Sequence, residues 1–367
     1  MRSCRIGQSI WSLCFFSFAS DIHVNKTLLA CALAAGLVGT AQAQSNVVLY
    51  GLVDLGYGYS KTDGSKALNS VDSSTSAGSR WGLRGSESLG NSLKLNFQLE
   101  SGFEADTGNR AQGGRMFGRA AWTSLSGAFG EVRLGRQDTL GFNWSGAISP
   151  FGTSFKQAQL DTIFGYKNVA DRVDNAVFYY TPDMGGFQAG VGYSFHPDGQ
   201  ETNINDTPVV SLGARYKSGP LLVVLTYDQK NVADSVTVAN RDDIKNLALG
   251  ATYNFGPVKV HAGYGRLQNR GYIASAAKEN AYLLGLTVPV GTGSVFGTYQ
   301  RVDNRNLNEY RNDKARDGFA VGYLYGLSKR TELYAYASLY SDVARRADVA
   351  TRLADTRQFS VGMRHRF

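Results

Sequence analysis

Arginine side chains stand on the polar sides of several segments whose neighbouring positions are apolar. Arg84 lies on the opposite face of its segment from Trp81 and Leu83, and Arg80 shares the face of Arg84. A guanidinium stays charged at any accessible pH, so a cluster of arginines creates a permanent positive field. The chemistry that these residues favour is therefore electrostatic, the orientation and filtering of charged solutes.

The alternation of odd and even positions, called parity below, also assigns a face to three further arginines. Arg119 shares its face with Arg115 rather than with Trp122. Arg133 is offset by one position from its apolar neighbours, and Arg172 opens an alternating segment. We therefore expect all three side chains to avoid the apolar face.

The residues that usually perform catalysis or bind metals form no recognisable pattern. All three cysteines of the chain lie within the first 43 residues. The histidines that follow, His196, His261 and His365, are far apart and lack the spacing of metal ligands. No nucleophile elbow is present. We therefore predict that the protein is not an enzyme and needs neither metal nor cofactor.

The elements that position the arginines are indicated by a period of two. In residues 92–100, Leu and Phe alternate with Lys, Asn, Gln and Glu. Residues 247–255, 258–264 and 359–367 repeat this pattern. Successive side chains of a strand point to opposite faces, so each segment reads as a strand with one apolar and one polar face. The chain is predicted to be all-β.

We predict sixteen strands, an even number that places both ends of the mature chain on the same side. Their expected ranges are 46–60, 79–88, 92–103, 115–126, 130–137, 172–182, 187–196, 208–217, 221–230, 243–255, 258–268, 279–289, 293–302, 315–327, 331–341 and 357–367.

Alternation is also found in soluble β-sandwiches, which stay open as an alternative at this point. Aromatic residues near strand ends and an alternation of short turns with long polar connections favour a transmembrane barrel. A closed barrel leaves no unpaired strand edge in lipid. Inside such a barrel the arginines would face water, because an arginine on the lipid side at mid-membrane costs about 2–4 kcal/mol.

The first 43 residues resemble an export signal behind an upstream extension. Lys26 precedes an apolar run over residues 28–38, and Ala41-Gln42-Ala43 matches a cleavage site. We expect the signal proper at residues 24–43, with translation starting at Val24, and a mature chain of residues 44–367; the alternative is a buried helix. Cleavage after Ala43 removes three basic residues and one acidic residue, which lowers the formal charge from +8 to +6.

Four motifs in order along the chain resemble Gram-negative general porins of the outer membrane. They read VLYGLVD at 48–54, SRWGLRGSE at 79–87, FGEVRLGRQ at 129–137 and LSKRTELY at 327–334. The likeness is to the β-proteobacterial branch of the Burkholderia, Bordetella and Neisseria type, and it covers essentially the whole mature chain.

The resemblance implies a homotrimer of 16-stranded antiparallel barrels in the cell outer membrane, with short periplasmic turns and long external loops. It implies passive diffusion of ions and small hydrophilic solutes, narrowed by a third external loop that folds into the pore over about residues 138–171. It also implies contact with lipopolysaccharide and outer-membrane lipid. The terminal Phe367 resembles the signal that such proteins present to the outer-membrane assembly machinery.

Combining parity with this resemblance gives a hypothesis for the pore lining. An arginine cluster would face an acidic inner loop and make the pore weakly charge-selective. The expected residues are Arg84, Arg119, Arg172, Arg133, Asp161 and Asp138. The alternative is that some arginines only pair with Glu87, Glu100 or Asp174 in the wall, without a role in conduction.

Two other functions stay open at this point. A substrate-specific channel would share the barrel and add binding side chains. A non-conducting surface barrel, such as a protease or an adhesin, would conduct little. The positive net charge favours a preference for anions. The basic run over residues 301–316 is interrupted by acidic residues, so nucleic-acid binding is not expected.

Overall fold

The computed structural model describes residues 46–155, 158, 164, 166–199, 207–232, 243–269, 278–305, 313–346 and 349–367. The chain divides into two units, Met1–Ala43 and Gln44–Phe367. The predicted export signal and the extension before it lie outside the described residues, and so does Asp161. The description below concerns the second unit.

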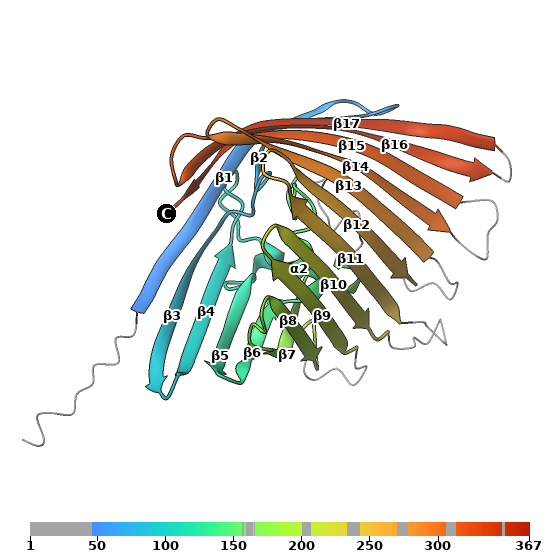
Figure 1. Cartoon of the computed structure of the whole chain (residues 1–367). Coiled ribbons are helices and arrows are strands. Elements are labelled where there is room, and N and C mark those ends of the chain that lie inside the picture. The colour runs from blue at the N-terminus through green and yellow to red at the C-terminus, as the bar shows by residue number, and fades with distance from the viewer. Residues whose placement is uncertain are drawn as a thin grey trace, which may run out of the picture. The chain divides into compact units, whose positions relative to one another are not determined.

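Strands make up nearly all of the second unit (Figure 1). Their bounds are β1 (Asn46–Thr62), β2 (Leu68–Ser73), β3 (Arg80–Gly90), β4 (Leu93–Gly102), β5 (Ala120–Gly127), β6 (Gly130–Asp138), β7 (Arg172–Tyr180), β8 (Phe187–Ser194), β9 (Val209–Ser218), β10 (Leu221–Lys230), β11 (Ile244–Asn254), β12 (Lys259–Gln268), β13 (Lys278–Val290), β14 (Gly293–Arg305), β15 (Asp313–Gly326), β16 (Thr331–Arg346) and β17 (Val349–Arg366).

Helical structure in the described residues is short. It comprises the 3₁₀ turn η1 (Gln112–Gly114) and the helices α2 (Leu140–Ser145) and α4 (Tyr166–Val169). Among the described residues, no helix combines the length and the apolar character needed to cross a membrane.

The strands form one antiparallel sheet that closes on itself. From β3 to β17 each strand pairs with the next, and β1 pairs with both β3 and β17. Leu52 marks the junction, opposite Arg80 on one side and Arg366 on the other. The short β2 pairs with residues 55–60 of β1, and β3 pairs with residues 46–52 of the same strand. The strands β2 and β3 therefore occupy a single strand position beside β1 in the barrel. The prediction of a closed 16-stranded barrel is confirmed.

Four details of the strand prediction are wrong. The strand β2 was not predicted, β5 begins at Ala120 rather than at 115, β16 ends at Arg346 rather than at 341, and β17 begins at Val349 rather than at 357. Polar residues on both faces hide the period of two in β2 and at the start of β17. Strand β5 is shorter than predicted because its pairing with β4 ends at the pair Glu100 and Ala120.

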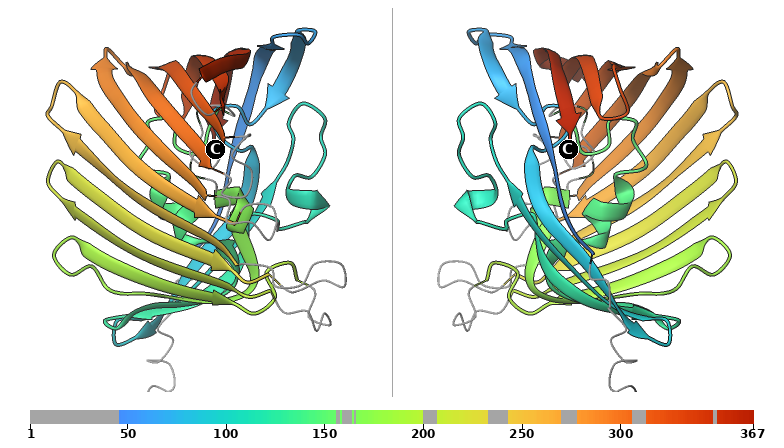
Figure 2. Two further views of the ribbon diagram at one scale, coloured as in Figure 1. Left: turned by 90° about the vertical axis from the view of Figure 1, so that its right-hand side faces the viewer. Right: turned by 90° about the vertical axis from the view of Figure 1, so that its left-hand side faces the viewer.

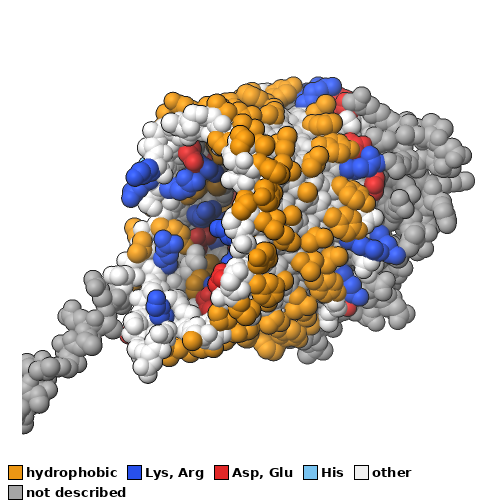
Figure 3. All heavy atoms as spheres, viewed as in Figure 1, with side chains coloured by type: hydrophobic (Ala, Val, Ile, Leu, Met, Phe, Trp, Pro, Cys, Tyr) orange, Lys and Arg blue, Asp and Glu red, His pale blue; other side chains and the backbone are white. Residues whose placement is uncertain are grey.

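The outer face of the barrel is apolar. Large side chains such as Leu49, Leu284 and Phe319 are each 57–60% exposed. In Figure 3 hydrophobic side chains cover the strands, whereas basic and acidic side chains gather in a hollow beside them. A soluble monomer rarely exposes a continuous apolar surface of this extent, so this face is suited to lipid or to another protein.

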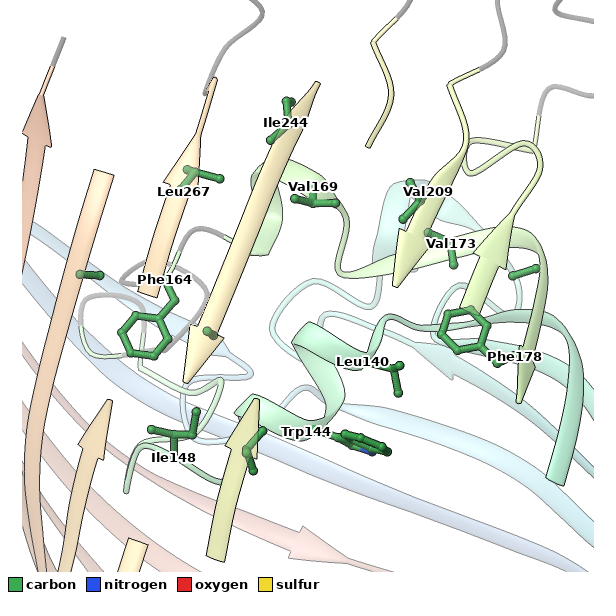
Figure 4. Packing of buried hydrophobic residues seen from close by; sticks show 14 of the residues in the cluster. Leu140, Trp144, Ile148, Phe164, Val169, Val173, Phe178, Val209, Ile244 and Leu267 are labelled. Carbon is green, nitrogen blue, oxygen red and sulfur yellow. The ribbon is translucent and has the colours of Figure 1, made fainter. Parts of the chain in front are cut away.

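Residues 139–171 connect β6 to β7 and are called the inner loop below; those of them that the structure describes pack inside the ring of strands (Figure 2). Leu140, Trp144, Ile148 and Phe164 of the loop are buried in one cluster with wall residues such as Phe178. Figure 4 shows the loop side chains pointing towards those of the wall. The loop therefore folds into the lumen, as the resemblance implied.

Glycines in the wall make room for this packing. A Cβ atom on Gly213 of β9 would lie 2.8 Å from the Trp144 ring, and one on Gly263 of β12 would lie 2.8 Å from the Phe164 ring. Both distances are shorter than a van der Waals contact. The lumen-facing side of these strands therefore needs glycine in order to admit the large loop side chains.

Candidate functional site: a constricted lumen

The start of the inner loop is fixed to the wall by polar contacts. The Thr139 hydroxyl caps helix α2 by accepting from the Phe142 N–H at 3.3 Å. The buried Ser211 hydroxyl accepts from the Leu140 N–H at 2.8 Å and donates to Asp228 at 2.5 Å. Since each of these groups has a hydrogen-bond partner, the start of the helix is held against β9 and β10.

The middle of the loop is held by a buried histidine. His261 Nδ1 lies 3.0 Å from the Ile148 carbonyl oxygen, and Nε2 lies 3.0 Å from the Thr287 hydroxyl. A carbonyl only accepts, so Nδ1 carries the proton and Nε2 accepts from Thr287. This geometry gives His261 a structural role in positioning the loop.

The far part of the loop meets an inward-turning segment, residues 74–79, that separates β2 from β3. Asp54 of β1 is fully buried and accepts hydrogen bonds from the N–H groups of Ser76 at 3.0 Å and Ala77 at 2.7 Å. Tyr334 donates a third hydrogen bond to Asp54 at 2.8 Å. One carboxylate thus fixes the segment to the wall.

This segment in turn holds the loop tip. The Phe155 N–H donates to the Thr75 carbonyl at 2.9 Å, and the Ser154 hydroxyl donates to the Ser76 carbonyl. The centre of the Phe155 ring lies 5.2 Å from that of Tyr336 on β16, with the two rings tilted by 58°. The first half of the loop is therefore anchored at its start, at Ile148 and at Phe155.

A cavity of about 410 Å³ remains between the loop and the opposite wall, and we call it the constriction. Its lining residues are Leu52, Ser76, Ala77, Arg80, Asp138, Phe142, Asn143, Gly146, Gly152, Thr153, Ser154, Arg364 and Arg366. Three arginines of β3 and β17 thus face an inner loop whose lining is uncharged in the described residues, with Asp138 at its root as the one acid.

Beside the constriction, Glu100 of β4 is shared by two arginines. It accepts from Arg119 Nε at 2.6 Å and from the Tyr50 hydroxyl at 2.7 Å, and Arg80 Nε lies 3.8 Å away. Arg172 pairs with Asp138 at 2.8 Å, and its Nε lies 3.2 Å from the Arg119 carbonyl. The network thus links strands β1, β3, β4, β6 and β7.

Two further carboxylates are each shared by two arginines. Glu332 pairs with Arg364 and, at 3.1 Å, with Arg366. Asp174 pairs with Arg136 at 2.7 Å and with a second arginine, Arg115. Wherever one carboxylate serves two guanidinium groups, a positive charge is left over, so the network as a whole is positive.

Comparison with known proteins assigns this barrel to a family. The chain matches the family model described as Gram-negative porin over residues 28–344. It belongs to this family. The porin is 37% identical to an outer membrane porin protein of Bordetella pertussis, over 94% of this chain and 100% of that protein. It is 35% identical to outer membrane porin protein 32 of Delftia acidovorans, over 85% of this chain and 88% of that one.

Among solved structures, this porin is similar to an anion-selective porin from Comamonas acidovorans. The identity is 30% and the TM-score 0.73, with 88% of this chain and 100% of that one covered. Major outer membrane protein P.IB of Neisseria meningitidis is a more distant relative at 25% identity. The predicted β-proteobacterial branch and the outer-membrane location are confirmed, and the family supports a passive channel.

Of the predicted lining residues, the porin brings Arg119, Arg172 and Asp138 into the network at the constriction. Asp138 lines the cavity, whereas Arg119 is drawn to Glu100, which is the wall pairing considered as the alternative. Asp161 lies outside the described residues. A lining role in conduction stays a proposal for each of these residues.

Arg84 and Arg133 lie in a separate cavity of about 550 Å³. The guanidinium of Arg133 lies 3.9 Å from the centre of the Trp122 ring, and that of Arg84 lies 5.1 Å from the centre of the Tyr50 ring. The expectation that Trp122 faces away from Arg119 is wrong. Arg119 precedes the first residue of β5, so strand parity does not fix its direction, and both side chains reach the lumen.

Three arginines of the constriction were missing from the predicted set. Arg80 shares the face of Arg84, and parity alone could not tell which of the two meets the loop. Arg364 and Arg366 alternate with apolar residues in the last strand, and this pattern could have suggested them. The closure of the barrel brings β17 beside β1 and so beside Arg80.

The terminal residue Phe367 completes the closure. Its backbone exchanges two hydrogen bonds of 3.1 Å with Gly51, and its ring lies over the Gly51 Cα. Among the described residues, no cluster of three or more His, Cys, Asp or Glu could hold a metal ion. The arrangement offers a narrowed water path with fixed charges, which is suited to filtering solutes.

Proposed function

We propose that this porin is an outer-membrane diffusion channel for small hydrophilic solutes with a preference for anions. The observation that carries the proposal is the charge balance at the constriction, which Arg80, Arg364, Arg366 and Asp138 line. With their ion-pair partners included, five arginines (Arg80, Arg119, Arg172, Arg364 and Arg366) share three carboxylates (Glu100, Asp138 and Glu332), which leaves an excess of positive charge at the narrow point.

The geometry explains why this excess acts on passing ions. Charges in a narrow space with low-dielectric walls interact more strongly than charges in open water. Arg80 lies 3.8 Å from Glu100, which is at the limit of an ion pair, whereas Arg119 holds the same carboxylate at 2.6 Å. The charge of Arg80 is thus only partly compensated, and it is directed at the constriction.

The test is the reversal potential of the purified porin in a planar lipid bilayer with a potassium chloride gradient. We expect a potential whose sign shows that chloride crosses more readily than potassium. A potential of the opposite sign, or none, would contradict the proposed anion preference.

Single variants locate the selectivity within the barrel. The change Arg80→Gln should lower the ratio of chloride to potassium permeability, because it removes a guanidinium from the constriction. The matched control is Arg357→Gln, on the outer-facing side of β17, where the side chain is exposed and pairs with Asp63. Equal effects of both variants would contradict a local filter at Arg80.

A substrate-specific channel is the second candidate considered above. It would show transport rates that saturate at moderate solute concentration, whereas a general channel would show rates proportional to concentration. Liposome-swelling rates measured over a series of sugar concentrations separate the two functions.

We further propose that the porin assembles as a homotrimer, as the family resemblance implies. The proposal is supported by the outer face of β1, where Val47 and Leu49 are exposed near the short-turn end and need cover from lipid or a second copy. Sedimentation of the detergent-solubilised protein tests it, and a monomeric mass would contradict it.

Contact with lipopolysaccharide, and recognition of Phe367 by the assembly machinery, are proposals of the same kind. The change Phe367→Ala should lower the amount of barrel in the outer membrane, because it removes both the terminal aromatic ring and the packing on Gly51. Outer-membrane fractionation measures the amount. Leu327→Ala, an exposed apolar residue of a short turn, is the control.

A further inference from the structure

The outward face of β11 to β13 carries an apolar hollow of about 690 Å³, which we call the wall hollow. Its floor is made of small residues, since Ala251 of β11 stands directly opposite Ala262 of β12. Its lining residues are Val223, Leu249, Gly250, Ala251, Ala262, Gly263, Tyr264, Tyr282, Leu283, Leu284 and Tyr299. A second outward hollow of about 910 Å³, towards β16, shares Leu284 and Tyr299 with the first, so the two are continuous.

A row of basic residues lies beyond the hollow, at the end of these strands from which the long connections leave. The row consists of Lys245 on β11, Arg266 on β12 and Lys278 on β13. Each lies an even number of residues from a member of the hollow on its own strand, and these members are Leu249, Tyr264 and Tyr282. Since side chains of a strand alternate between its faces, the three basic side chains point outward like the hollow.

The register of the ladders brings the three basic residues together. Lys245 and Lys278 both stand opposite Gln268 of β12, one from each side, and Arg266 lies two residues away on the same face. Diagonal neighbours of this kind are about 7–8 Å apart. Figure 3 shows basic side chains along the edge of the apolar surface.

The charge of this basic row is not compensated by the acidic residues around it. Among the described residues, no carboxylate forms an ion pair with a member of the row, whereas Arg301 of the next strand pairs with both Asp303 and Asp317. Asp243, just before β11, instead accepts a hydrogen bond from Gln229 at 2.7 Å. The row therefore offers three positive charges to a group outside the protein.

The opposite end of the same three strands has no such charge. Between the hollow and the short turns, the large outward side chains of the described residues are all apolar or aromatic, namely Tyr253, Leu286, Val288 and Val290. The positive charge thus marks the end with the long connections, which the family resemblance places on the external side. An anionic group held there belongs to the outer leaflet of the membrane.

The combination of a basic row and an apolar hollow fits a lipid better than it fits another copy of the porin. A phosphorylated lipid carries its negative charge directly above its acyl chains, in the order in which this face presents its basic row and its hollow. The strands β13 to β17 separate β12 from β1, whose outer face is the one proposed for trimer contacts. The face of β11 to β13 is therefore left to lipid in the assembled trimer.

We propose that the outward face of β11 to β13 binds a lipid A molecule of the outer leaflet, a site that rests on the proposed contact with lipopolysaccharide and localises it. Phosphate of the lipid meets Arg266 and Lys278, and an acyl chain lies in the wall hollow over Ala251 and Ala262. A guanidinium binds phosphate through two parallel hydrogen bonds, and a nearby ammonium adds a point charge.

The test is native mass spectrometry of the purified, delipidated porin in detergent, titrated with lipid A. We expect a lipid adduct on each barrel, and Arg266→Gln should raise the half-saturating lipid concentration about tenfold, the loss expected for a charged hydrogen bond. The matched control is Arg316→Gln, which lies at the same end of the barrel but pairs with Asp342 on β16. Equal binding by the wild type and Arg266→Gln would overturn the site.

A second pair of variants tests the hollow without changing any charge. Ala262→Phe should fill the hollow and weaken lipid binding, and the barrel should still fold because Ala262 is exposed on the outward face. The control is Ala214→Phe on β9, outside the hollow, opposite the exposed Leu225. Equal lipid binding by these two variants would overturn the part assigned to the hollow.

Two further probes identify what the site recognises. Lipid A without its phosphate groups should bind at least about tenfold more weakly to the wild type, because it offers no partner for Arg266. Inorganic phosphate should not displace lipid A, because it has no acyl chain. Equal binding of the dephosphorylated lipid, displacement by inorganic phosphate, or association of further porin copies in place of a lipid adduct would each overturn the proposal.

The same titrations separate this site from the proposed function. An absence of lipid A binding to the wild type would refute both the contact with lipopolysaccharide and the site. Binding that is equal in the wild type, Arg266→Gln and Ala262→Phe would keep the contact and refute the site. The anion preference is measured independently in the potassium chloride gradient.

Discussion

The inner wall of the barrel has two halves that use the same strand pattern in opposite ways. On β9 to β12 the lumen-facing side carries glycine and apolar residues together with a few buried polar groups such as Asp228 and His261, and the inner loop packs on it through Trp144 and Phe164. On β1, β3, β4 and β17 the lumen-facing side carries arginine, glutamate and tyrosine, and it stays open to water at the constriction.

The difference shows that a lumen-facing position does not have to be polar. The polarity of such a position depends on whether the inner loop or water covers it. Where the loop covers the wall, Gly213 and Gly263 leave space for its rings. Where water covers the wall, Arg80 and its neighbours keep their charges hydrated or paired. The loop thus divides the lumen into a packed side and a conducting side.

The largest expected effect comes from removing the packing of the loop. The change Trp144→Ala should weaken the attachment of the loop by about 3–5 kcal/mol, as for large core residues elsewhere. We expect a noisier open-channel current and a lower midpoint of thermal unfolding in detergent. Leu134→Ala, an exposed apolar residue on the outer face of β6, is the control and should change neither. Equal current noise and equal unfolding midpoints in the two variants would contradict the claim that packing of the inner loop stabilises this half of the barrel.

A somewhat smaller effect is expected at the junction of the two halves. Asp54→Ala leaves the buried N–H group of Ser76 without its acceptor, at a cost of about 1–3 kcal/mol, and the half-buried N–H group of Ala77 loses the same partner. The segment over residues 74–79 should then release the loop tip. Proteolysis within the loop, followed by mass spectrometry, should speed up in Asp54→Ala and stay at the wild-type rate in Asp106→Ala, an exposed control.

The conducting half responds to charge rather than to packing. Glu100→Gln removes the carboxylate shared by Arg80 and Arg119 while its amide keeps a hydrogen-bond acceptor. We expect a stronger anion preference, by about 1 kcal/mol or less, which is the Coulomb energy of two unit charges at contact distance in water. The reversal potential measures it. Glu87→Gln, which lies outside the constriction, should leave the reversal potential as it is, and a shift there would contradict a local origin.

The smallest effect concerns ionic strength. Mobile ions screen fixed charges over about 10 Å at 0.1 M salt and about 3 Å at 1 M salt. At a constant concentration ratio, the anion preference should therefore fall as total salt rises. An anion preference that does not depend on salt would indicate selection by size or by direct contact. It would contradict the claim that the electrostatic field of the arginines causes the preference.

The fold could be predicted from the sequence in most of its parts. A period of two in segments such as residues 92–100 fixes the two faces of a strand, and turn residues mark its ends. The prediction failed for β2 and for the start of β17, where polar residues occur at both odd and even positions. A strand whose two faces have similar polarity leaves no period of two in the sequence.

The site could be predicted only in part. Parity placed Arg84 and Arg80 on one face, but their depth relative to the loop depends on the register of β3 against β1. Arg364 reaches the same cavity only because β17 pairs with β1 across more than 300 residues of chain. Contacts of this kind depend on closure of the barrel, which no local pattern contains.

By itself, the sequence determined the strands, their two faces and the family, because each of these follows from the order of side chains along a backbone of fixed period. The tertiary structure alone decided which arginines meet at the constriction, which carboxylates they share, and that Trp122 backs Arg133. Those contacts depend on barrel closure and on the path of the inner loop, and both are set by packing between residues far apart in the chain.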